Sequence, residues 1–138
     1  MNTMIKIVSH INLNEAYAYL NSPKAGAINL FVGTVRNNAH GKDVEKLLFE
    51  AYEPMAIKEM EKIAERAQEK WSISKLLMVH VVGEKAVGEA VVVTGIASPH
   101  RKEAFEATQF LIDELKKTVP IWKKEFYQDG SIWVNAHP

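Results

Sequence analysis

The sequence predicts an α+β fold in which helices are mixed with antiparallel β-hairpins. Two apolar segments, 75–82 and 90–96, flank a short glycine-containing turn, which is the pattern of a hairpin. A second such pair, 122–127 and 131–134, flanks a Gln-Asp-Gly turn near the C-terminus. Helices next to hairpins favour α+β over a parallel sheet built from repeated strand–helix–strand units.

The N-terminal third combines short strands with one short helix. We expect, in order, a strand, a helix capped by Asn14, a turn, a second strand and a polar loop, at residues 5–8, 14–20, 21–23, 27–32 and 36–43. Asparagine favours a helix N-cap because its side chain accepts a hydrogen bond from a free backbone N–H. Proline in the turn and glycine at the ends of the loop interrupt regular structure there.

The spacing of apolar residues predicts two longer helices. A strand at 44–52 precedes the first helix, and Pro54 suits its first turn. Its apolar residues recur three and four apart, as on a helix face that packs on a core: Ala56, Met60, Ile63, Ala64, Ala67 and Trp71. The second helix is expected from about 101 to 118, with the stripe Phe105, Thr108, Ile112 and Leu115.

Composition excludes several classes of protein. The 138 residues are 47% hydrophobic, which suits one domain over residues 1–138. Lys+Arg and Asp+Glu are both 17, so neither nucleic acid nor an anionic membrane is favoured as a partner. No apolar run approaches the roughly 20 residues that span a bilayer, and no signal-peptide pattern is present, so we expect a cytoplasmic protein. The absence of cysteine excludes disulfides, thiolate nucleophiles and Cys-ligated zinc.

Cationic residues gather at the two ends of the predicted helix 101–118. Ser98-Pro99 ends the preceding strand, and His100 and Arg101 follow at the helix start, where free backbone N–H groups and the helix dipole favour anions. Lys116 and Lys123 lie at and beyond the other end. Because the chain is neutral overall, a local cationic cluster indicates a small anionic ligand.

Lys116 has two interpretations. At about 100° per residue, it lies about 20° around the helix axis from Phe105, whereas Lys117 lies about 120° away. Lys116 therefore flanks the predicted apolar stripe, and Lys117 points towards water. Either the aliphatic stem of Lys116 covers the edge of the core, or its amine is held beside other cations as an acid, base or nucleophile.

Arg36 and Lys123 are the other candidate ligand-binding residues. Arg36 begins the polar loop; it is either a solvated loop arginine or a fork for phosphate or carboxylate, helped by the backbone N–H groups of Thr34 and Val35. Strand alternation places Lys123 opposite Trp122, but it does not say which face forms the pocket. The five histidines show no metal-ligand spacing, so no metal site is expected. His80 lies inside an apolar strand and is expected to be a histidine of the core. The residues alone predict an anion pocket lined by Arg36, His100, Arg101, Lys116 and Lys123.

Most of the chain, from Gly26 to Val134, carries short motifs whose order and spacing are together highly specific. They are Phe31-Val32-Gly33-Thr34-Val35-Arg36-Asn37, Phe49-Glu50-Ala51-Tyr52, Val79-His80, Ser98-Pro99-His100-Arg101, Leu115-Lys116 and Pro120-Ile121-Trp122-Lys123-Lys124-Glu125. In these motifs the sequence resembles the large, catalytic subunit of molybdopterin synthase. Members of that family often carry arginine after the strand histidine, where this chain has Val81, so a contact made by that arginine is not carried over.

The resemblance implies a fold, a reaction and partners. It implies an α/β-hammerhead-like domain with additional antiparallel strands. The enzyme would convert cyclic pyranopterin monophosphate into molybdopterin by installing a dithiolene, without a cofactor. Both sulfurs would arrive as a thiocarboxylate on the C-terminal glycine of a small ubiquitin-like carrier subunit, which fits a chain without cysteine. Large subunits would form a homodimer at the centre of a heterotetramer.

The resemblance also implies roles for individual residues. Lys116 and Lys123 would be the catalytic lysines, and Arg36, His100 and Arg101 would hold the cyclic phosphate. Four further residues would line the substrate site: Thr34, Val35, Lys124 and Glu125.

A second hypothesis is a non-catalytic homologue that binds phosphate, pterin or the carrier through the same pocket. Retention of both Lys116 and Lys123 favours the enzyme, because a binding module needs positive charge but not two positioned lysines.

Overall fold

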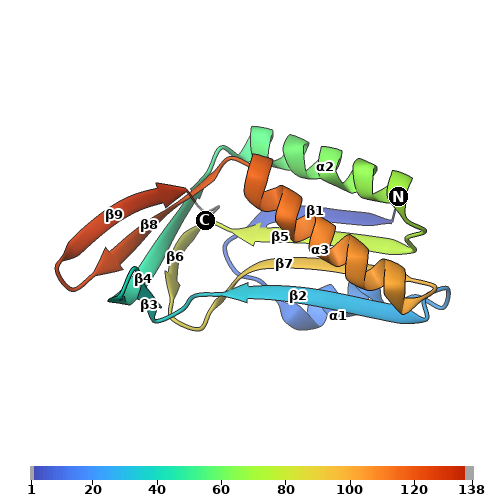
Figure 1. Cartoon of the computed structure of the whole chain (residues 1–138), viewed down its shortest axis with the longest axis horizontal. Helices are drawn as coiled ribbons and strands as arrows, with labels where there is room; N and C mark the ends of the chain where they lie inside the picture. The colour runs from blue at the N-terminus through green and yellow to red at the C-terminus, as the bar shows by residue number, and fades with distance from the viewer. Residues whose placement is uncertain (1, 136–138) are drawn as a thin grey trace.

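Residues 2–135, which the computed structural model describes, form two β-sheets and three α-helices (Figure 1). The elements are β1 (Thr3–Val8), α1 (Leu13–Leu20), β2 (Ala27–Thr34), β3 (Asn38–Ala39), β4 (Lys42–Ala51), α2 (Glu53–Lys70), β5 (Lys75–Val81), β6 (Gly83–Ala86), β7 (Ala90–Ser98), α3 (Arg101–Thr118), β8 (Ile121–Tyr127) and β9 (Gly130–Asn135). Helices combined with mostly antiparallel strands confirm the predicted α+β class.

The first sheet has the strand order β1-β5-β7-β2, with β1 parallel to β5 and the other pairs antiparallel. Helices α2 and α3 cover one face and α1 lies on the other (Figure 1). Alternate side chains of β5 point to opposite faces of the sheet, as strand geometry requires. Leu76 and Met78 pack in the cluster under α2 and α3, whereas Leu77 and Val79 pack with α1. Strand β2 is at one edge of this sheet.

The N-cap of α1 is Asn12, so the prediction that Asn14 caps this helix was wrong. The Asn12 side chain accepts a hydrogen bond from the backbone N–H of Glu15 at 3.1 Å. Helix α1 therefore begins at Leu13, and Asn14 lies exposed in its first turn. Both asparagines have the right chemistry, and packing of Ala16 and Leu20 against the sheet decides between them.

The predicted stripe of α2 is confirmed, whereas that of α3 is wrong in one residue. In α2 the side chains of Ala56, Met60, Ile63, Ala64 and Ala67 are buried, with Trp71 as the C-cap. In α3 the buried set is Ala104, Ala107, Thr108, Leu111, Ile112 and Leu115. Phe105, expected in the core, is 60% exposed, because α3 turns its small residues Ala104 and Ala107 towards the sheet instead.

The second sheet has the order β3-β4-β8-β9. Strand β6 also pairs with β4, on the edge of β4 that faces away from β8. The predicted polar loop 36–43 is in part a hairpin: β3 and β4 are joined by His40 and Gly41, both with positive φ (54° and 75°), as in a two-residue type I′ turn. The predicted hairpin of β8 and β9 is confirmed.

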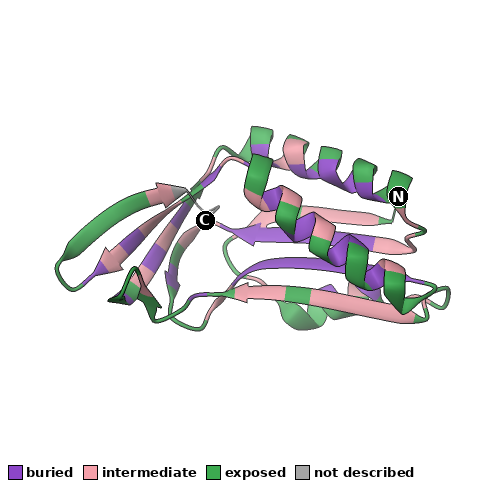
Figure 2. Cartoon of the chain, viewed as in Figure 1, coloured by how far each residue is buried: buried purple, intermediate pink, exposed green. Residues whose placement is uncertain are grey.

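The connection between β5 and β7 is not the simple hairpin that was predicted. The two strands do pair antiparallel, but the chain between them leaves the first sheet and adds β6 to the second, with Leu48 opposite Glu84. The two sheets are thereby tied at one end of β5 and β7. Figure 2 shows that β5 and β7 are mostly buried, whereas much of β9 is exposed.

Two methionines of α2 provide a test of this packing. Met60 is fully buried and Met55 is 43% exposed. Met60→Ala is expected to lower the free energy of unfolding by about 2–5 kcal/mol, because it removes buried methylenes and leaves a cavity. Met55→Ala, the same substitution on the same helix, is expected to change it by less than about 0.5 kcal/mol. Urea unfolding measures both values; equal losses would contradict the placement of α2.

Candidate active site

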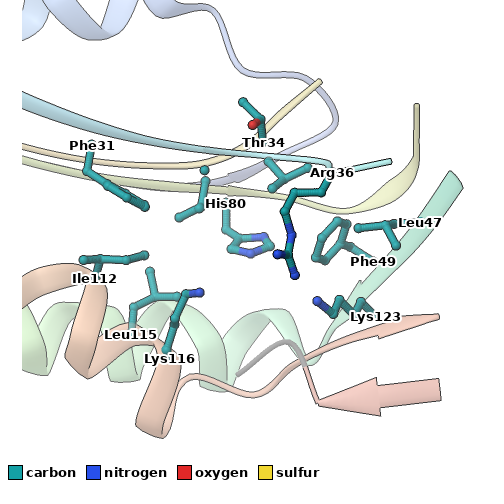
Figure 3. A pocket seen from close by; sticks show the side chains of 13 residues that line it. Phe31, Thr34, Arg36, Leu47, Phe49, His80, Ile112, Leu115, Lys116 and Lys123 are labelled. Atoms are coloured by element: carbon teal, nitrogen blue, oxygen red, sulfur yellow. The ribbon is translucent and has the colours of Figure 1, made fainter. Parts of the chain in front are cut away.

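A cavity of about 250 Å³ lies where the two sheets meet the C-terminal end of α3. Arg36 follows β2, Lys116 comes from the last turn of α3, and Lys123 comes from β8. Figure 3 shows these three cationic side chains pointing towards one another across the cavity. The structure thus brings together three of the cationic residues that the sequence singled out.

The rest of the wall is largely apolar and contains a histidine that sequence reasoning placed in the core. His80 is 4% exposed, lines the cavity and packs edge-on to Phe49, with ring centroids 5.1 Å apart. Its Nδ1 lies 2.8 Å from the carbonyl oxygen of Val81, and Val81 itself is buried outside the lining. Strand periodicity predicted burial of His80 correctly, but it carried no signal that β4 and α3 leave a cavity beside it.

Lys116 lies at the edge of the buried face of α3, as predicted, although for a different reason. Phe105 does not define that face; Ile112 does, and Lys116 lies about 40° around the helix from it. The side chain of Lys116 is half-buried and lines the cavity. Lys117 is exposed and pairs with Glu114 at 3.2 Å, so the predicted difference between the neighbouring lysines is confirmed.

Strand alternation in β8 places Lys123 on the cavity side. Ile121, Glu125 and Tyr127 face inward with it, whereas Trp122 is 45% exposed. The Lys123 ammonium lies 3.5 Å from Oε2 of Glu125. This resolves the choice of face that spacing alone left open.

Glu125 is a buried carboxylate behind Lys123. It is 3% exposed, and its Oε1 accepts a hydrogen bond from the Tyr127 hydroxyl and lies 3.5 Å from Nε2 of His40. The hydrogen bond to Glu125, together with burial, raises the pKa of Tyr127 to about 12, because ionised tyrosine could not donate and would face a negative charge.

The cavity carries more positive than negative charge. Arg36, Lys116 and Lys123 face it, and Glu125 offsets one of them. Neither Arg36 nor Lys116 forms an ion pair with another described residue. Cations brought together without counter-charges repel one another, and an anionic ligand removes that cost. The arrangement therefore suits a small anion, with donors from three directions.

Five of the predicted site residues do not line the cavity: Val35, His100, Arg101, Lys124 and Glu125. His100 and Arg101 are exposed at the start of α3, and the fifteen residues from Arg101 to Lys116 separate them from the cavity by about 22 Å along the helix. Lys124 points to the opposite face of β8, with its ammonium over the rings of Phe126 and Trp133.

Val35 also differs from the prediction, whereas Thr34 agrees with it. Thr34 lines the cavity. Val35 is buried, and its backbone N–H, expected to help bind an anion, donates instead to the carbonyl of Glu89 at 3.1 Å. Glu125 lies behind Lys123 rather than in the wall.

Among residues 2–135, no group of three or more His, Asp or Glu side chains is placed to hold a metal ion. No helix in this range is long and apolar enough to cross a bilayer.

Comparison with known proteins finds matches over nearly the whole chain. Residues 7–118 match the family described as MoaE protein. The molybdopterin synthase catalytic subunit of Pyrococcus abyssi is 42% identical over 134 residues, which cover 97% of this chain and 90% of that protein. The crystal structure of molybdopterin synthase from Staphylococcus aureus is similar with a TM-score of 0.88 and 35% identity, covering 94% of each chain. A complex of subunits 1 and 2 of molybdopterin-converting factor from Helicobacter pylori has a TM-score of 0.78 over 100% of this chain and 94% of that one; at 24% identity it shows a shared fold.

The contact between Tyr127 and Glu125 predicts a loss of stability at high pH. The pKa of Tyr127 is about 12 in the folded protein, whereas the usual value of 10.0 applies in the unfolded chain. Between these pH values the folded state keeps a proton that the unfolded state has lost, so the free energy of unfolding falls as pH rises from about 10 to 12.

Tyr127→Phe removes the ionisable group and is the control for all other titrations in this range. Urea unfolding of both proteins across that range should therefore show the wild type losing stability relative to the variant. A difference that stays constant with pH would contradict the hydrogen bond.

Proposed function

We propose how this chain works on the premise that it belongs to the MoaE protein family. Its relatives include molybdopterin synthase catalytic subunits, and it acts as the catalytic subunit of such a synthase. The observation that carries the mechanism is the meeting of Arg36, Lys116 and Lys123 in one cavity. We treat residues 1–138 as one catalytic-subunit domain and place it in the cytoplasm, as expected for a biosynthetic enzyme.

We propose that the cavity binds the cyclic phosphate and pterin of cyclic pyranopterin monophosphate. Arg36 has a planar fork of donors that suits phosphate oxygens, and it has no competing ion pair among the described residues. Phe31, Phe49 and His80 give the cavity flat and apolar surfaces beside the cations, which suit a ring system.

The sulfur donor is proposed to be a small ubiquitin-like carrier whose C-terminal thiocarboxylate enters the cavity. Since the chain has no cysteine, the sulfur must come from another molecule. The related Helicobacter pylori structure contains two subunits, which supports a carrier as partner. A thiocarboxylate is itself an anion, so the cations that bind the phosphate also favour the carrier tail.

The two lysines are proposed to have different roles because their surroundings differ. Lys123 is fixed by Glu125 at 3.5 Å, so it orients the substrate or the incoming tail. Lys116 has no such partner among the described residues and can supply a proton to the oxygen that leaves the pterin side chain. It can also stabilise negative charge on the acyl group of the carrier when the carbon–sulfur bond is hydrolysed.

We propose that a second copy of the chain supplies His100 and Arg101. Strand β2 is a sheet edge, and an edge offers unpaired backbone groups to another chain. Ala27, at the start of β2, pairs with Ser98 beside the start of α3, while Thr34 at its end lines the cavity. Two copies that meet along β2 with two-fold symmetry place the start of one strand beside the end of the other. The helix start of each copy then approaches the cavity of its partner.

This dimer is the proposed centre of a heterotetramer with two carriers. The dimer also gives His100 and Arg101 a role in binding, although within one chain they lie far from the cavity. The alternative of a non-catalytic binding module would need Arg36 and the dimer but not a Lys116 amine that lacks an ion-pair partner among the described residues. Product formation from the purified chain, a thiocarboxylated carrier and the pterin precursor separates the two, since a binding module makes no dithiolene.

Substitution of Lys116 tests the chemistry. Lys116→Ala is expected to lower the rate of dithiolene formation by roughly 10²–10⁴-fold, as expected for loss of a positioned acid, while carrier binding stays nearly unchanged. Lys116→Arg should not restore the rate, because guanidinium does not give up its proton near neutral pH. Lys117→Ala is the matched control, since that exposed neighbour pairs with Glu114 and should have nearly wild-type activity. Near-normal activity of Lys116→Arg would reduce Lys116 to an electrostatic contact.

A mixture of two variants that each bind the precursor weakly tests the shared site. Arg36→Ala and Arg101→Ala should each weaken precursor binding by roughly 1.5–3 kcal/mol, the worth of a hydrogen bond to a charged group. When the two variants are unfolded and refolded together in equal amounts, half of the dimers are mixed, and each mixed dimer has one intact site. Activity at low precursor concentration should recover to about a quarter of the wild-type value. No recovery would show that both arginines act within one chain, or that Arg101 has no part in the site.

A further inference from the structure

Glu125 connects the cavity with a second group of side chains that the mechanism above does not use. Its Oε2 faces Lys123 at 3.5 Å. Its other oxygen, Oε1, accepts a hydrogen bond from the Tyr127 hydroxyl and lies 3.5 Å from Nε2 of His40. The two oxygens of one buried carboxylate are thus divided between the active site and this second group.

His40 and Tyr127 line a separate cavity of about 290 Å³ at the β3–β4 and β8–β9 turns. The side chain of His40 is largely exposed there, whereas Glu125 is 3% exposed. Glu125 therefore connects the two cavities. It contacts Lys123, which lines the substrate cavity, and it contacts His40 and Tyr127, which line the outer cavity.

The backbone holds both contacts in place. His40 has a φ of 54°, which is unusual for a residue other than glycine. The turn that requires this conformation joins β3 to β4, and β4 pairs with β8 so that Val44 lies opposite Tyr127. Tyr127 follows Glu125 by two residues on β8, so both side chains point to the same face.

The buried Glu125 carboxylate needs hydrogen-bond donors or positive charge around it. Removed from water, it is stabilised only by groups that donate to it or carry positive charge. The ionisable groups around it are Lys123 and Tyr127 from β8 and His40 from the β3–β4 turn; Lys42 lies over the ring of Tyr127 and pairs with Asp129. Only Tyr127 makes a hydrogen bond to Glu125 within the described side-chain contacts. Loss of that bond frees the carboxylate to rotate away from Lys123.

We propose that Tyr127 and His40 are positioning residues of the sulfur-transfer reaction, which act by holding Glu125 and, through it, the Lys123 ammonium at the cavity wall. The proposal rests on the proposed function and goes beyond it, because neither Tyr127 nor His40 lines the substrate cavity. Among residues 2–135, Arg36 and Lys116 form no hydrogen bond or ion pair with Glu125, Tyr127 or His40. Loss of the contacts that Tyr127 and His40 make with Glu125 should therefore lower kcat more than it raises KM for the precursor.

Three variants separate this role from general stability. Tyr127→Phe removes only the hydroxyl. His40→Asn removes the second contact to Glu125, because asparagine is too short to reach the position of Nε2 and tolerates the positive φ at this residue. Lys42→Gln is the matched control, because Lys42 lines the same outer cavity and contacts Tyr127 and Asp129 but not Glu125. In steady-state assays with saturating carrier, kcat of Tyr127→Phe should fall by about tenfold, the effect of losing one hydrogen bond to a charged group. KM for the precursor should stay within about twofold, and Lys42→Gln should match the wild type.

An optical titration of the tyrosines tests the contact without activity. The last tyrosine step of the wild type should lie at about 12, vanish in Tyr127→Phe and move towards the usual range in Glu125→Gln. This second arm holds even if Tyr127→Phe folds poorly, because Glu125→Gln keeps the tyrosine. A last step that Glu125→Gln leaves unchanged would overturn the proposal.

The kinetic outcomes distinguish this proposal from the proposed function. A wild-type chain that makes no dithiolene product overturns the proposed function and the positioning role with it. A wild-type chain that makes product, with Tyr127→Phe and His40→Asn equally active, overturns the positioning role alone. A loss in Lys42→Gln as large as that in Tyr127→Phe would also overturn it, because the effect would then come from the outer cavity rather than from Glu125.

Discussion

The cavity depends on the segment between β5 and β7, which leaves the first sheet and joins the second. After β5 the chain adds β6 to the edge of β4 and only then returns as β7. This pairing ties the second sheet to the end of the first, so that β8 faces the ends of β2 and β5. Side chains that are distant in the sequence, such as Arg36 and Lys123, consequently meet beside His80. A direct β5–β7 hairpin would leave the second sheet without this anchor.

The charges of the cavity follow from the same geometry and explain its chemistry. Three cations converge, and one buried carboxylate is present to offset them. Because Glu125 lies behind Lys123, the two lysines are unequal. Lys123 is held by Glu125, whereas Lys116 has no ion-pair partner among residues 2–135. The excess of positive charge favours anions such as a phosphate or a thiocarboxylate. The buried carboxylate in turn needs donors of its own, which gives a reason for Tyr127 and for the position of His40 in a left-handed turn.

Local patterns predicted most of the elements, because helix and strand periodicities are set by neighbours along the chain. They failed where tertiary packing decides. The rotation of α3 is an example: an apolar stripe through Phe105 and one through Ala104 are both compatible with the sequence, and close approach to the sheet selects the smaller residues. The pairing of the four-residue strand β6 with β4 was likewise not visible, since nothing local specifies the sheet that so short a strand joins.

In the candidate site, too, local patterns predicted some features and tertiary structure decided others. Lys116 and Arg36 were identified correctly as cavity residues, and the sequence distinguished Lys116 from Lys117 because one helix turn fixes their directions. His100 and Arg101 were grouped with them by chemistry, although a rigid helix of eighteen residues separates its two ends. In the proposed dimer a second copy of the chain brings such residues together, and a single sequence does not display symmetry. His80 was missed as a cavity residue because burial in a strand has the same signature whether or not space lies beside it.

The central claim is that one site is built from the cavity of one copy and the α3 start of another. The most direct measurement is a crystal structure of the assembled protein with its carrier and the cyclic pterin phosphate bound. We expect the phosphate to lie between Arg36 of one copy and His100 and Arg101 of the second, with the Lys116 ammonium near the carrier's terminal carbonyl. A phosphate bound by Arg36, Lys116 and Lys123 of a single copy, with every His100 and Arg101 in solvent, would contradict it.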